Sequence, residues 1–539
     1  MEEASTVECD VDVGVPSHSI EGKEQVEQVA MKGPPTLPWM RYPVEVDKYE
    51  GWLLDRVPSL HPRLQEALRK IGIETLFPVQ VAVWYETIGP GGGERDLCIC
   101  SPTGSGKTLA YALPLIQSLS GRILRRLRAL IVLPTRDLAM QVKTVFDSIS
   151  PFVGLSIGLA VGQTSVAVEA AELVRFPQRF VSSLKQPGSD DFGVPESGVD
   201  VLVATPGRLM DHIKNTKGFT LEHLQFLVVD ETDRLLREAY QDWLPSVLDA
   251  VATHVPSTGL SMKSKFSSID NVKTIRHSGL ERGYKGCTFP RVMKMVLSAT
   301  LTKDPVKISQ LKLHHPLYIA SSAGNNLYKL PPQLKAFKLV CKADDKPLML
   351  VALLQTFGKQ RTIIFTASVV ATHRLYVFLK CFEGLSSEVQ EYSSLQHQMV
   401  RSKALEAFRG GDAHILVASD GMARGMDVDG VVNIVNYDMP VYIKTYIHRV
   451  GRTARAGRAG CSFTFLRKEE VRHFKSLLKK AQNSSCKNYR LPSSAVEALQ
   501  PRYMSAFEKF KEFMASETAV STGSHTKQAT TNAKYLQTS

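Results

Sequence analysis

Short segments of almost continuous apolar residues recur along this chain, each followed by a longer segment of helical character. They lie at 96–101, 128–134, 199–205, 226–231 and 293–300, and again at 361–368, 414–419, 431–437 and 461–466. Strands that are apolar on both faces are typical of parallel sheets covered by helices on both sides. The pattern therefore predicts an α/β protein built from parallel sheets flanked by helices.

The apolar segments form two series, separated by a stretch rich in Gly, Asn and Pro at 322–333. A chain of 539 residues is too long for one hydrophobic core, so each series is expected to form its own domain. The predicted parts are a flexible N-terminal extension at 1–45, a first domain at 46–322, a second domain at 333–482, and a C-terminal extension at 483–539 that is disordered toward its end.

Charge and cysteine content restrict the partners and the compartment. Lys and Arg outnumber Asp and Glu by 66 to 53, and the net charge of +13 suits a polyanion such as nucleic acid. The eight cysteines include no C-x-x-C pair, so neither a zinc knuckle nor a disulfide framework is indicated. No run approaches the ~18 apolar residues of a membrane span, and the N-terminus lacks the apolar core of a signal peptide. We expect a soluble, intracellular protein with no membrane partner.

A glycine-rich loop, CICSPTGSGKT, joins the apolar run at 96–101 to a helix-compatible segment. Backbone N–H groups in such a loop close around phosphate oxygens, Lys107 neutralises their charge, and the Thr108 hydroxyl can bind Mg²⁺. The candidate phosphate-binding residues are Ser101, Pro102, Thr103, Gly104, Ser105, Gly106, Lys107 and Thr108. Because Ser101 occupies the first glycine position of the strict pattern, a flexible Gly/Ser turn is the alternative.

Three acids, Asp230, Glu231 and Asp233, follow the apolar run FLVV. Crowded carboxylates need a cation, a proton or exposure to solvent, so an exposed turn is one interpretation. The other follows from parallel topology, which brings the carboxyl ends of strands to one edge of a sheet, and so brings the acids to the glycine-rich loop. There Asp230 would hold Mg²⁺, and Glu231 would orient and deprotonate the attacking water.

These two segments, together with PTRDLAMQ, TPGR, SAT and HRVGRTAR, resemble the motif set of the DEAD-box RNA helicases. The match covers roughly residues 70–470. The resemblance implies two RecA-like domains with ATP and RNA bound in and across the cleft between them, and a monomeric RNA-dependent ATPase that unwinds short duplexes or remodels ribonucleoproteins. It also implies a subgroup in ribosomal RNA maturation, with precursor ribosomal RNA and ribosome-assembly proteins as partners in the nucleus or nucleolus.

For the nucleotide, the resemblance implies that Gln80 reads the adenine edge and that Asp427 contacts ATP. One departure is upstream, where Asp55 stands at a position that is usually aromatic and Trp52 is a candidate substitute. Thr232 replaces the alanine of the motif that names the family.

For RNA, the resemblance implies backbone contacts in both domains. The implied residues are Pro134, Thr135, Arg136, Thr205, Pro206, Gly207, Arg208, Gln398, Arg401, Ser419 and Arg424. Three departures lie nearby: Asp137 replaces the usual glutamate, Gly162-Gln163 replaces a glycine pair, and Ser393-Ser394 replaces the customary His-Gly.

The coupling residues connect these two sites. Ser298 and Thr300 lie at the end of a predicted strand, where their hydroxyls can bond to Asp233. The resemblance implies that these two residues transmit the state of the bound nucleotide to the RNA site. His448 is implied to link the second domain to the acids of the first.

Arg449, Arg452 and Arg455 recur at helical i, i+3 spacing, so we expect them to share one face and to need an anion. The resemblance assigns Arg452 and Arg455 to the γ-phosphate as arginine fingers. A solvated basic face is the alternative.

A basic insertion at about 252–292 separates the acids from SAT. It is either a plain surface loop or an auxiliary RNA contact, since its cations would raise phosphate affinity. For the whole chain, an ATP-gated RNA clamp with little unwinding activity is the alternative to a helicase, because both need the same closed state.

Overall fold

The computed structural model describes residues 37–535, with gaps at 91, 103, 177–194, 239–241, 253–290, 303, 321–329, 331–332, 386, 424–427, 429, 455–457 and 482–485. Within this part of the chain, no helix is both long enough and apolar enough to cross a membrane.

The first domain is built on an eight-stranded parallel sheet with the order β1-β12-β4-β11-β10-β5-β9-β6. Its strands are β1 (Val44–Glu45), β4 (Leu97–Cys100), β5 (Ala129–Val132), β6 (Ile157–Ala160), β9 (Val201–Ala204), β10 (Phe226–Val229), β11 (Met293–Ser298) and β12 (Leu317–Ala320). Two short antiparallel pairs lie outside the sheet: β2 (Trp52–Leu53) with β3 (Thr75–Leu76), and β7 (Val174–Arg175) with β8 (Glu196–Ser197).

Helices cover both faces of this sheet. They are α1 (Pro62–Lys70), α2 (Pro78–Ile88), α3 (Lys107–Leu119), α4 (Arg136–Ile149), α5 (Val166–Leu173), α6 (Pro206–Asn215), α7 (Thr232–Leu235), α8 (Trp243–Ala252) and α10 (Pro305–Ser309). Alternate residues of one strand enter different hydrophobic cores: Leu97 and Ile99 pack into one, and Cys98 and Cys100 into the other. Two buried faces explain why the strands are apolar at every position.

The second domain has a seven-stranded parallel sheet with the order β15-β16-β14-β17-β18-β13-β19. Its strands are β13 (Leu334–Val340), β14 (Thr362–Thr366), β15 (Val389–Tyr392), β16 (Ile415–Ser419), β17 (Asn433–Asn436), β18 (Gly460–Leu466) and β19 (Lys487–Asn488). Its helices are α11 (Lys346–Phe357), α12 (Val369–Cys381), α13 (Gln398–Gly410), α14 (Asp420–Ala423), α15 (Ile443–Val450), α16 (Glu470–Lys480) and α17 (Ser493–Tyr535).

The predicted fold class is confirmed, because both sheets are parallel and flanked by helices. Each of the nine predicted apolar segments contains one strand. The first sheet also includes β1, which precedes the boundary predicted at residue 46 and pairs with β12.

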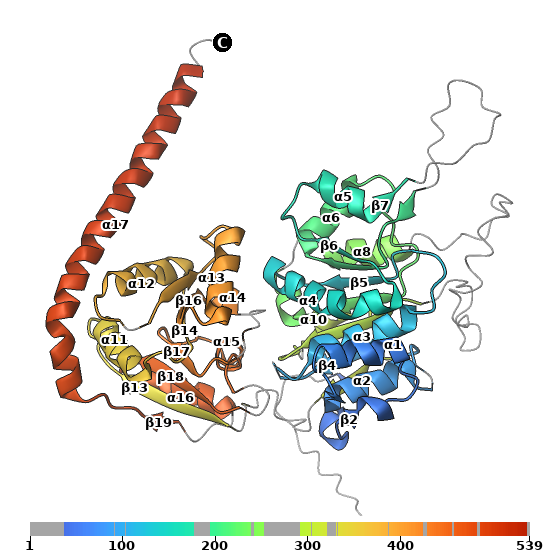
Figure 1. The fold of residues 1–539 in the computed structure, drawn as a ribbon, viewed down its shortest axis with the longest axis horizontal. Coiled ribbons are helices and arrows are strands. Elements are labelled where there is room, and N and C mark those ends of the chain that lie inside the picture. The colour runs from blue at the N-terminus through green and yellow to red at the C-terminus, as the bar shows by residue number, and fades with distance from the viewer. Residues whose placement is uncertain are drawn as a thin grey trace, which may run out of the picture.

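The C-terminal extension differs from its prediction. Where composition predicted disorder toward the end, α17 is helical as far as Tyr535 and runs away from the second domain (Figure 1). Its first part packs on α11 and α12, with Tyr503 and Phe510 edge-on to Phe378. A docked first part supplies the nucleus from which a helix extends, and no proline follows Pro501 to stop it.

Candidate active site

The glycine-rich loop connects the carboxyl end of β4 to the first turn of α3. Gly104 and Gly106 both have left-handed backbone angles, with φ of +82° and +83°. A Cβ atom on Gly106 would lie 2.3 Å from the Gln80 amide nitrogen, so only glycine fits there. The Ser101 hydroxyl donates to the Ser105 hydroxyl at 2.7 Å, which shows how a serine is accommodated at the first position. Thr103 lies outside the described residues.

Lys107 lies half-buried beneath this loop. Its ammonium group donates to the carbonyl oxygens of Ser101 and Pro102, both at 2.9 Å. Burial lowers its pKa, and the negative charges of Glu231 and Asp230 oppose that shift. A half-buried cation beneath a glycine-rich loop has the charge that a nucleotide phosphate requires.

Gln80 ties α2 to the loop. Its side-chain oxygen accepts from the Phe77 N–H at 2.8 Å, and its amide nitrogen donates to the Gly106 carbonyl at 3.1 Å. This contact places the predicted adenine-reading residue against the phosphate loop. Trp52 lies in β2, and Asp55 is an exposed residue that pairs with Arg69 at 2.5 Å.

The three acids are buried, with Asp230, Glu231 and Asp233 only 5%, 6% and 5% exposed. The exposed-turn interpretation is therefore wrong. Asp230 follows β10, and β11 separates that strand from β4, so the sheet brings the acids and the glycine-rich loop to one edge. Burial raises the pKa of the Asp230 carboxyl, while the positive charge of Lys107 opposes the rise. Buried carboxylates at this density favour a cation nearby.

The oxygen atoms near this edge suit Mg²⁺, which prefers carboxylate and hydroxyl ligands. The Tyr111 hydroxyl donates to Asp230 Oδ2 at 3.4 Å and also lies within hydrogen-bonding reach of Thr108. Thr108 and Asp230 therefore both lie close to the hydroxyl of one buried tyrosine. Glu231, Asp233 and His448 form a second group, each offering a ligand atom within 4.8 Å of the others. The residues present fit a divalent cation.

The acid segment is anchored to the neighbouring strand by hydroxyl groups. As predicted, Ser298 donates to Asp233 Oδ1 at 2.9 Å and Thr300 donates to Asp233 Oδ2 at 3.3 Å. The Thr232 hydroxyl lies near the carbonyl oxygens of Val229, at 2.7 Å, and Leu297, at 3.1 Å. Between these anchors Glu231 adopts a left-handed backbone, with φ of 50° and ψ of 44°. Sequence motifs did not indicate this conformation.

The arginines of the second domain do not share a helix face, so that prediction is wrong. Gly451 caps α15 after Val450, and Arg452 lies beyond the helix. Arg449 is 1% exposed, pairs with Asp420 at 2.5 Å and donates to the Asp438 carbonyl at 2.6 Å. Because Arg449 and Arg452 are both buried, the solvated-face alternative is also wrong.

Arg452 lies close enough to the first domain for its charge to act on Lys107. Its Nε donates to the His448 carbonyl at 3.3 Å, and its charge contributes to lowering the Lys107 pKa from across the cleft. Arg455, Arg424 and Asp427 lie outside the described residues.

The predicted RNA contacts divide into two groups. One group lines a cavity of about 370 Å³ between the domains, and includes Pro134, Thr135, Arg136, Arg401 and Ser419. Asp137 connects the domains here, accepting from Gln398 Nε2 at 2.5 Å and pairing with Arg401 at 3.5 Å.

The second group, Thr205, Pro206, Gly207 and Arg208, lies at the start of α6 and is not among the residues that line this cavity. Arg208 pairs with Glu169 at 3.2 Å and donates to the Thr164 carbonyl at 2.9 Å. A Cβ atom on Gly162 would lie 2.9 Å from the Arg208 guanidinium. Arg208 therefore packs tightly against the Gly162-Gln163 turn.

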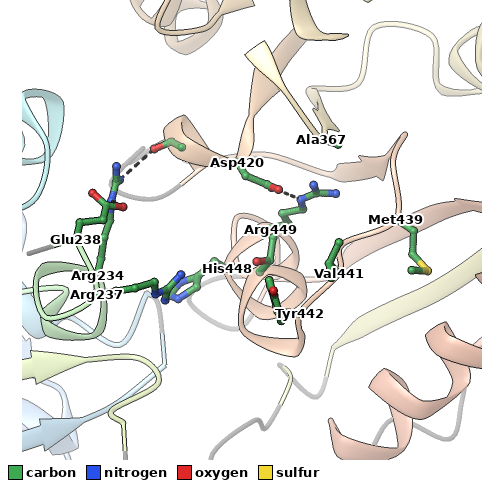
Figure 2. A pocket seen from close by; sticks show the side chains of 12 residues that line it. Arg234, Arg237, Glu238, Ala367, Asp420, Met439, Val441, Tyr442, His448 and Arg449 are labelled. Atoms are coloured by element: carbon green, nitrogen blue, oxygen red, sulfur yellow. Dashed lines mark hydrogen bonds and ion pairs between the residues drawn. The ribbon is translucent and has the colours of Figure 1, made fainter. Parts of the chain in front are cut away.

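A second interdomain cavity, of about 300 Å³, has Arg234, Arg237 and Glu238 on one side and Asp420, His448 and Arg449 on the other (Figure 2). The Arg234 guanidinium donates to the Gly421 carbonyl at 3.2 Å, and Lys444 donates to the Thr300 carbonyl at 2.8 Å. These two cations join the domains through main-chain oxygens. Sequence motifs did not single out Arg234 or Tyr111, because a contact with a residue far along the chain leaves no local pattern.

Comparison with known proteins gives consistent matches. The family model described as DEAD/DEAH box helicase matches residues 77–308, and that described as helicase conserved C-terminal domain matches 345–457. The chain is 54% identical to DEAD-box ATP-dependent RNA helicase 1 of Oryza sativa subsp. japonica, over 90% of this chain and 92% of that protein. It is 37% identical to human ATP-dependent RNA helicase DDX51, over 86% of this chain and 69% of that protein.

Solved structures agree in fold. DEAD-box helicase Mss116 bound to single-stranded RNA and UDP-BeF aligns with a TM-score of 0.64 at 22% identity, over 86% of this chain and 89% of that one. Dbp5 of S. cerevisiae bound to RNA and ADP BeF3 aligns with a TM-score of 0.61 at 20% identity, over 84% of this chain and 99% of that one.

Proposed function

The chain belongs to the DEAD-box family of ATP-dependent RNA helicases, and we propose that it hydrolyses ATP at the buried acids beside the phosphate loop in order to separate short RNA duplexes. The observation that carries this proposal is the convergence of Glu231 and Asp233 from the first domain with His448 from the second, within 4.8 Å. Acids and bases from two domains meet at this distance only when the cleft between the domains is closed.

The proposed division of labour at the ATP site follows from position and charge. Lys107 and the loop N–H groups hold the phosphates, and Gln80 contacts the adenine. Thr108 and Asp230 would hold Mg²⁺, which offsets phosphate charge when it is bound. Glu231 orients the attacking water and accepts its proton, while Arg452, with Arg455, stabilises the charge on the transferred phosphoryl group.

Coupling to RNA runs through the same residues. Asp233 accepts hydrogen bonds from Ser298 and Thr300, and it lies within 4.8 Å of His448 from the other domain. We propose that loss of phosphate loosens the cleft and so separates Gln398, Arg401 and Ser419 from Thr135 and Arg136, the two halves of the RNA surface. Contacts of this kind recognise phosphates and 2′-hydroxyls, so binding is largely independent of base sequence and is sensitive to salt.

The biological substrate we propose is precursor ribosomal RNA, with ribosome-assembly proteins as partners and the nucleolus as the location. What supports this is the resemblance of the motif set to a subgroup in ribosomal RNA maturation.

The proposal is tested by ATP hydrolysis measured with RNA and with DNA of the same sequence. We expect RNA to stimulate hydrolysis and DNA not to, because contacts to 2′-hydroxyls distinguish the two. Equal stimulation by DNA would contradict an RNA-directed function. Displacement of a short duplex, with Glu231→Gln as the inactive control, then separates unwinding from clamping.

Two variants test the assigned roles. Lys107→Ala should weaken nucleotide binding, since it removes the phosphate-binding cation. Glu231→Gln should keep nucleotide binding and lose turnover, since it removes the base. Normal steady-state hydrolysis by the Gln variant would exclude Glu231 from this role.

A further inference from the structure

A histidine on the second domain lies between two carboxylates from different elements. His373 on α12 has its Nδ1 2.9 Å from Glu391 Oε2, on β15. Its Nε2 lies 3.3 and 3.2 Å from the two carboxylate oxygens of Glu517, on α17. Since neutral imidazole has one N–H, only the imidazolium donates to both acids. The three side chains form a charged bridge from the C-terminal helix to the sheet.

Glu391, at the inner end of this bridge, holds the loop that leads into α13. It is buried, its Oε1 accepts from the Ser393 hydroxyl at 2.5 Å, and its Oε2 accepts from the Gln396 amide at 3.1 Å. Ser393 is one of the two serines that replace the usual His-Gly pair. The loop 393–397 is thus fixed by one carboxylate that His373 also contacts.

The same loop positions a proposed RNA-binding side chain. The Gln396 carbonyl accepts from Arg401 Nη1 at 3.1 Å, and Arg401 also bonds to Gln398. Ser394 and Arg401 line the interdomain cavity of about 370 Å³. A shift of Glu391 would therefore be transmitted to Arg401 through Gln396.

The outer end of the bridge depends on how α17 docks. Leu499 and Ala506 are buried in the core of the second domain, and Phe510 lies edge-on to Phe378 of α12. Lys509 pairs with Glu383 on the same side. These contacts place Glu517 opposite His373.

We propose that α17 is part of the RNA-binding apparatus, and that Glu517 and His373 are positioning residues that hold the loop 393–397 and Arg401 in the geometry that binds RNA. The inference rests on the proposed RNA contact of Arg401. It assigns a functional task to a C-terminal helix that lies outside both matched helicase regions.

The strength of this bridge should depend on pH, because it requires a protonated His373. Burial lowers the pKa of His373, but the hydrogen bonds and charges of Glu391 and Glu517 outweigh that effect and raise it above the ordinary value. The acting charges are Glu391 from β15 and Glu517 from α17. Because the pKa of His373 is raised, the bridge stabilises the folded protein fully below the ordinary histidine pKa of about 6.5. This stabilisation is lost as the pH rises through the raised pKa.

The test measures affinity of the full chain for a fluorescein-labelled oligouridine, with ADP and beryllium fluoride present, by anisotropy between about pH 6 and pH 9. We expect wild-type affinity to fall as His373 deprotonates. His373→Gln should bind the RNA at least about fivefold more weakly than wild type at acid pH, and its affinity should not fall further as the pH rises. The affinity of Glu517→Gln should still fall as the pH rises, but the fall should occur at lower pH, because one of the two acids that stabilise the imidazolium is gone.

The matched control is Glu512→Gln on the exposed side of α17, which should bind as wild type at every pH. If His373→Gln bound RNA like wild type across the range, the inference would be overturned, even if its melting temperature fell, since that result describes a purely structural bridge. Arg401→Ala separates the two proposals. If it bound RNA normally, both the proposed contact and this inference would fail, whereas weak binding by Arg401→Ala with normal binding by His373→Gln would overturn the inference alone.

Discussion

Arg449 and Arg452 are three positions apart in the chain, and their surroundings assign them different tasks. Arg449 is held by Asp420 and the Asp438 carbonyl within its own domain, so its charge is neutralised locally. Arg452 lies past the end of α15 and its charge reaches Lys107 across the cleft. Of the two, Arg452 is therefore the one that we propose as the contact to a nucleotide phosphate.

Arg452→Lys should reduce ATP turnover by roughly 10³–10⁵, because lysine keeps the charge but lacks the planar fork that grips phosphate oxygens. RNA affinity without nucleotide should stay unchanged. Steady-state hydrolysis measures the effect, and Arg458→Lys, at an exposed position nearby, is the control. Full turnover by Arg452→Lys would rule out its assignment as an arginine finger.

Single residues also show what the sequence could and could not predict. The bonds from Ser298 and Thr300 to Asp233 were predictable, because strand ends meet at one edge of a parallel sheet and the motif spacing identifies the strands. The bonds from Gln398 and Arg401 to Asp137 were not, because they depend on how two domains face each other. The left-handed backbone of Glu231 could not be predicted either, because glycine is the usual sequence signal for this conformation and the residue is a glutamate.

Among the elements, buried strands were the most predictable, because a strand covered on both faces is apolar at every position. The two-residue strands β1 and β19 carry no such run, and their places at the sheet edges are set by pairing with β12 and β13. The sequence did not predict the end of α15, because the i, i+3 spacing of the arginines continues past Gly451, the residue that caps the helix. Spacing alone predicts a face only where the backbone stays helical.

The docking of α17 gives a prediction at this scale. Phe510→Ala should lower the free energy of unfolding of the second domain by about 2 kcal/mol, since a half-buried aromatic ring leaves its contacts with Phe378 and Phe507. Urea unfolding measures the change. Phe513→Ala, on the same helix but 45% exposed, should stay within about 0.5 kcal/mol of wild type. Equal effects of the two substitutions would mean that α17 does not dock as described.

At the scale of the whole molecule, the residues that flank the basic insertion and the active site lie at opposite edges of the first sheet. The insertion leaves after α8 and returns at the amino end of β11, and its residues 253–290 lie outside the described part of the chain. Arg291, beside it, pairs at 2.5 Å with Asp96, a buried residue at the amino end of β4. Lys294 contacts the same acid at 3.9 Å.

Replacing Ser261–Cys287 with a short Gly/Ser linker should leave basal ATP hydrolysis intact, because Arg291, the first described residue after the insertion, pairs with Asp96 at the amino end of β4, away from the catalytic edge. It should reduce RNA affinity and flatten the slope of log affinity against log salt, because cations that displace counterions are removed. Binding measured at several salt concentrations gives the slope. An unchanged slope would identify the insertion as a plain surface loop.

The left-handed backbone at Glu231 has a consequence for the stability of the entire protein. A side chain in this conformation costs roughly 1–2 kcal/mol, and the buried carboxylate adds repulsion from its acidic neighbours. Glu231→Gln relieves the repulsion alone, and Glu231→Gly relieves both. We expect both variants to resist urea better than wild type, with the glycine variant about 1 kcal/mol beyond the glutamine variant. If the glycine variant were no more stable than the glutamine variant, the backbone conformation would not be strained, and if the glutamine variant were no more stable than wild type, the charge repulsion would be absent. With Glu231 as the base proposed above, the enzyme would give up thermodynamic stability for catalysis at one residue, and selection for a more heat-resistant chain would act against activity at that position first.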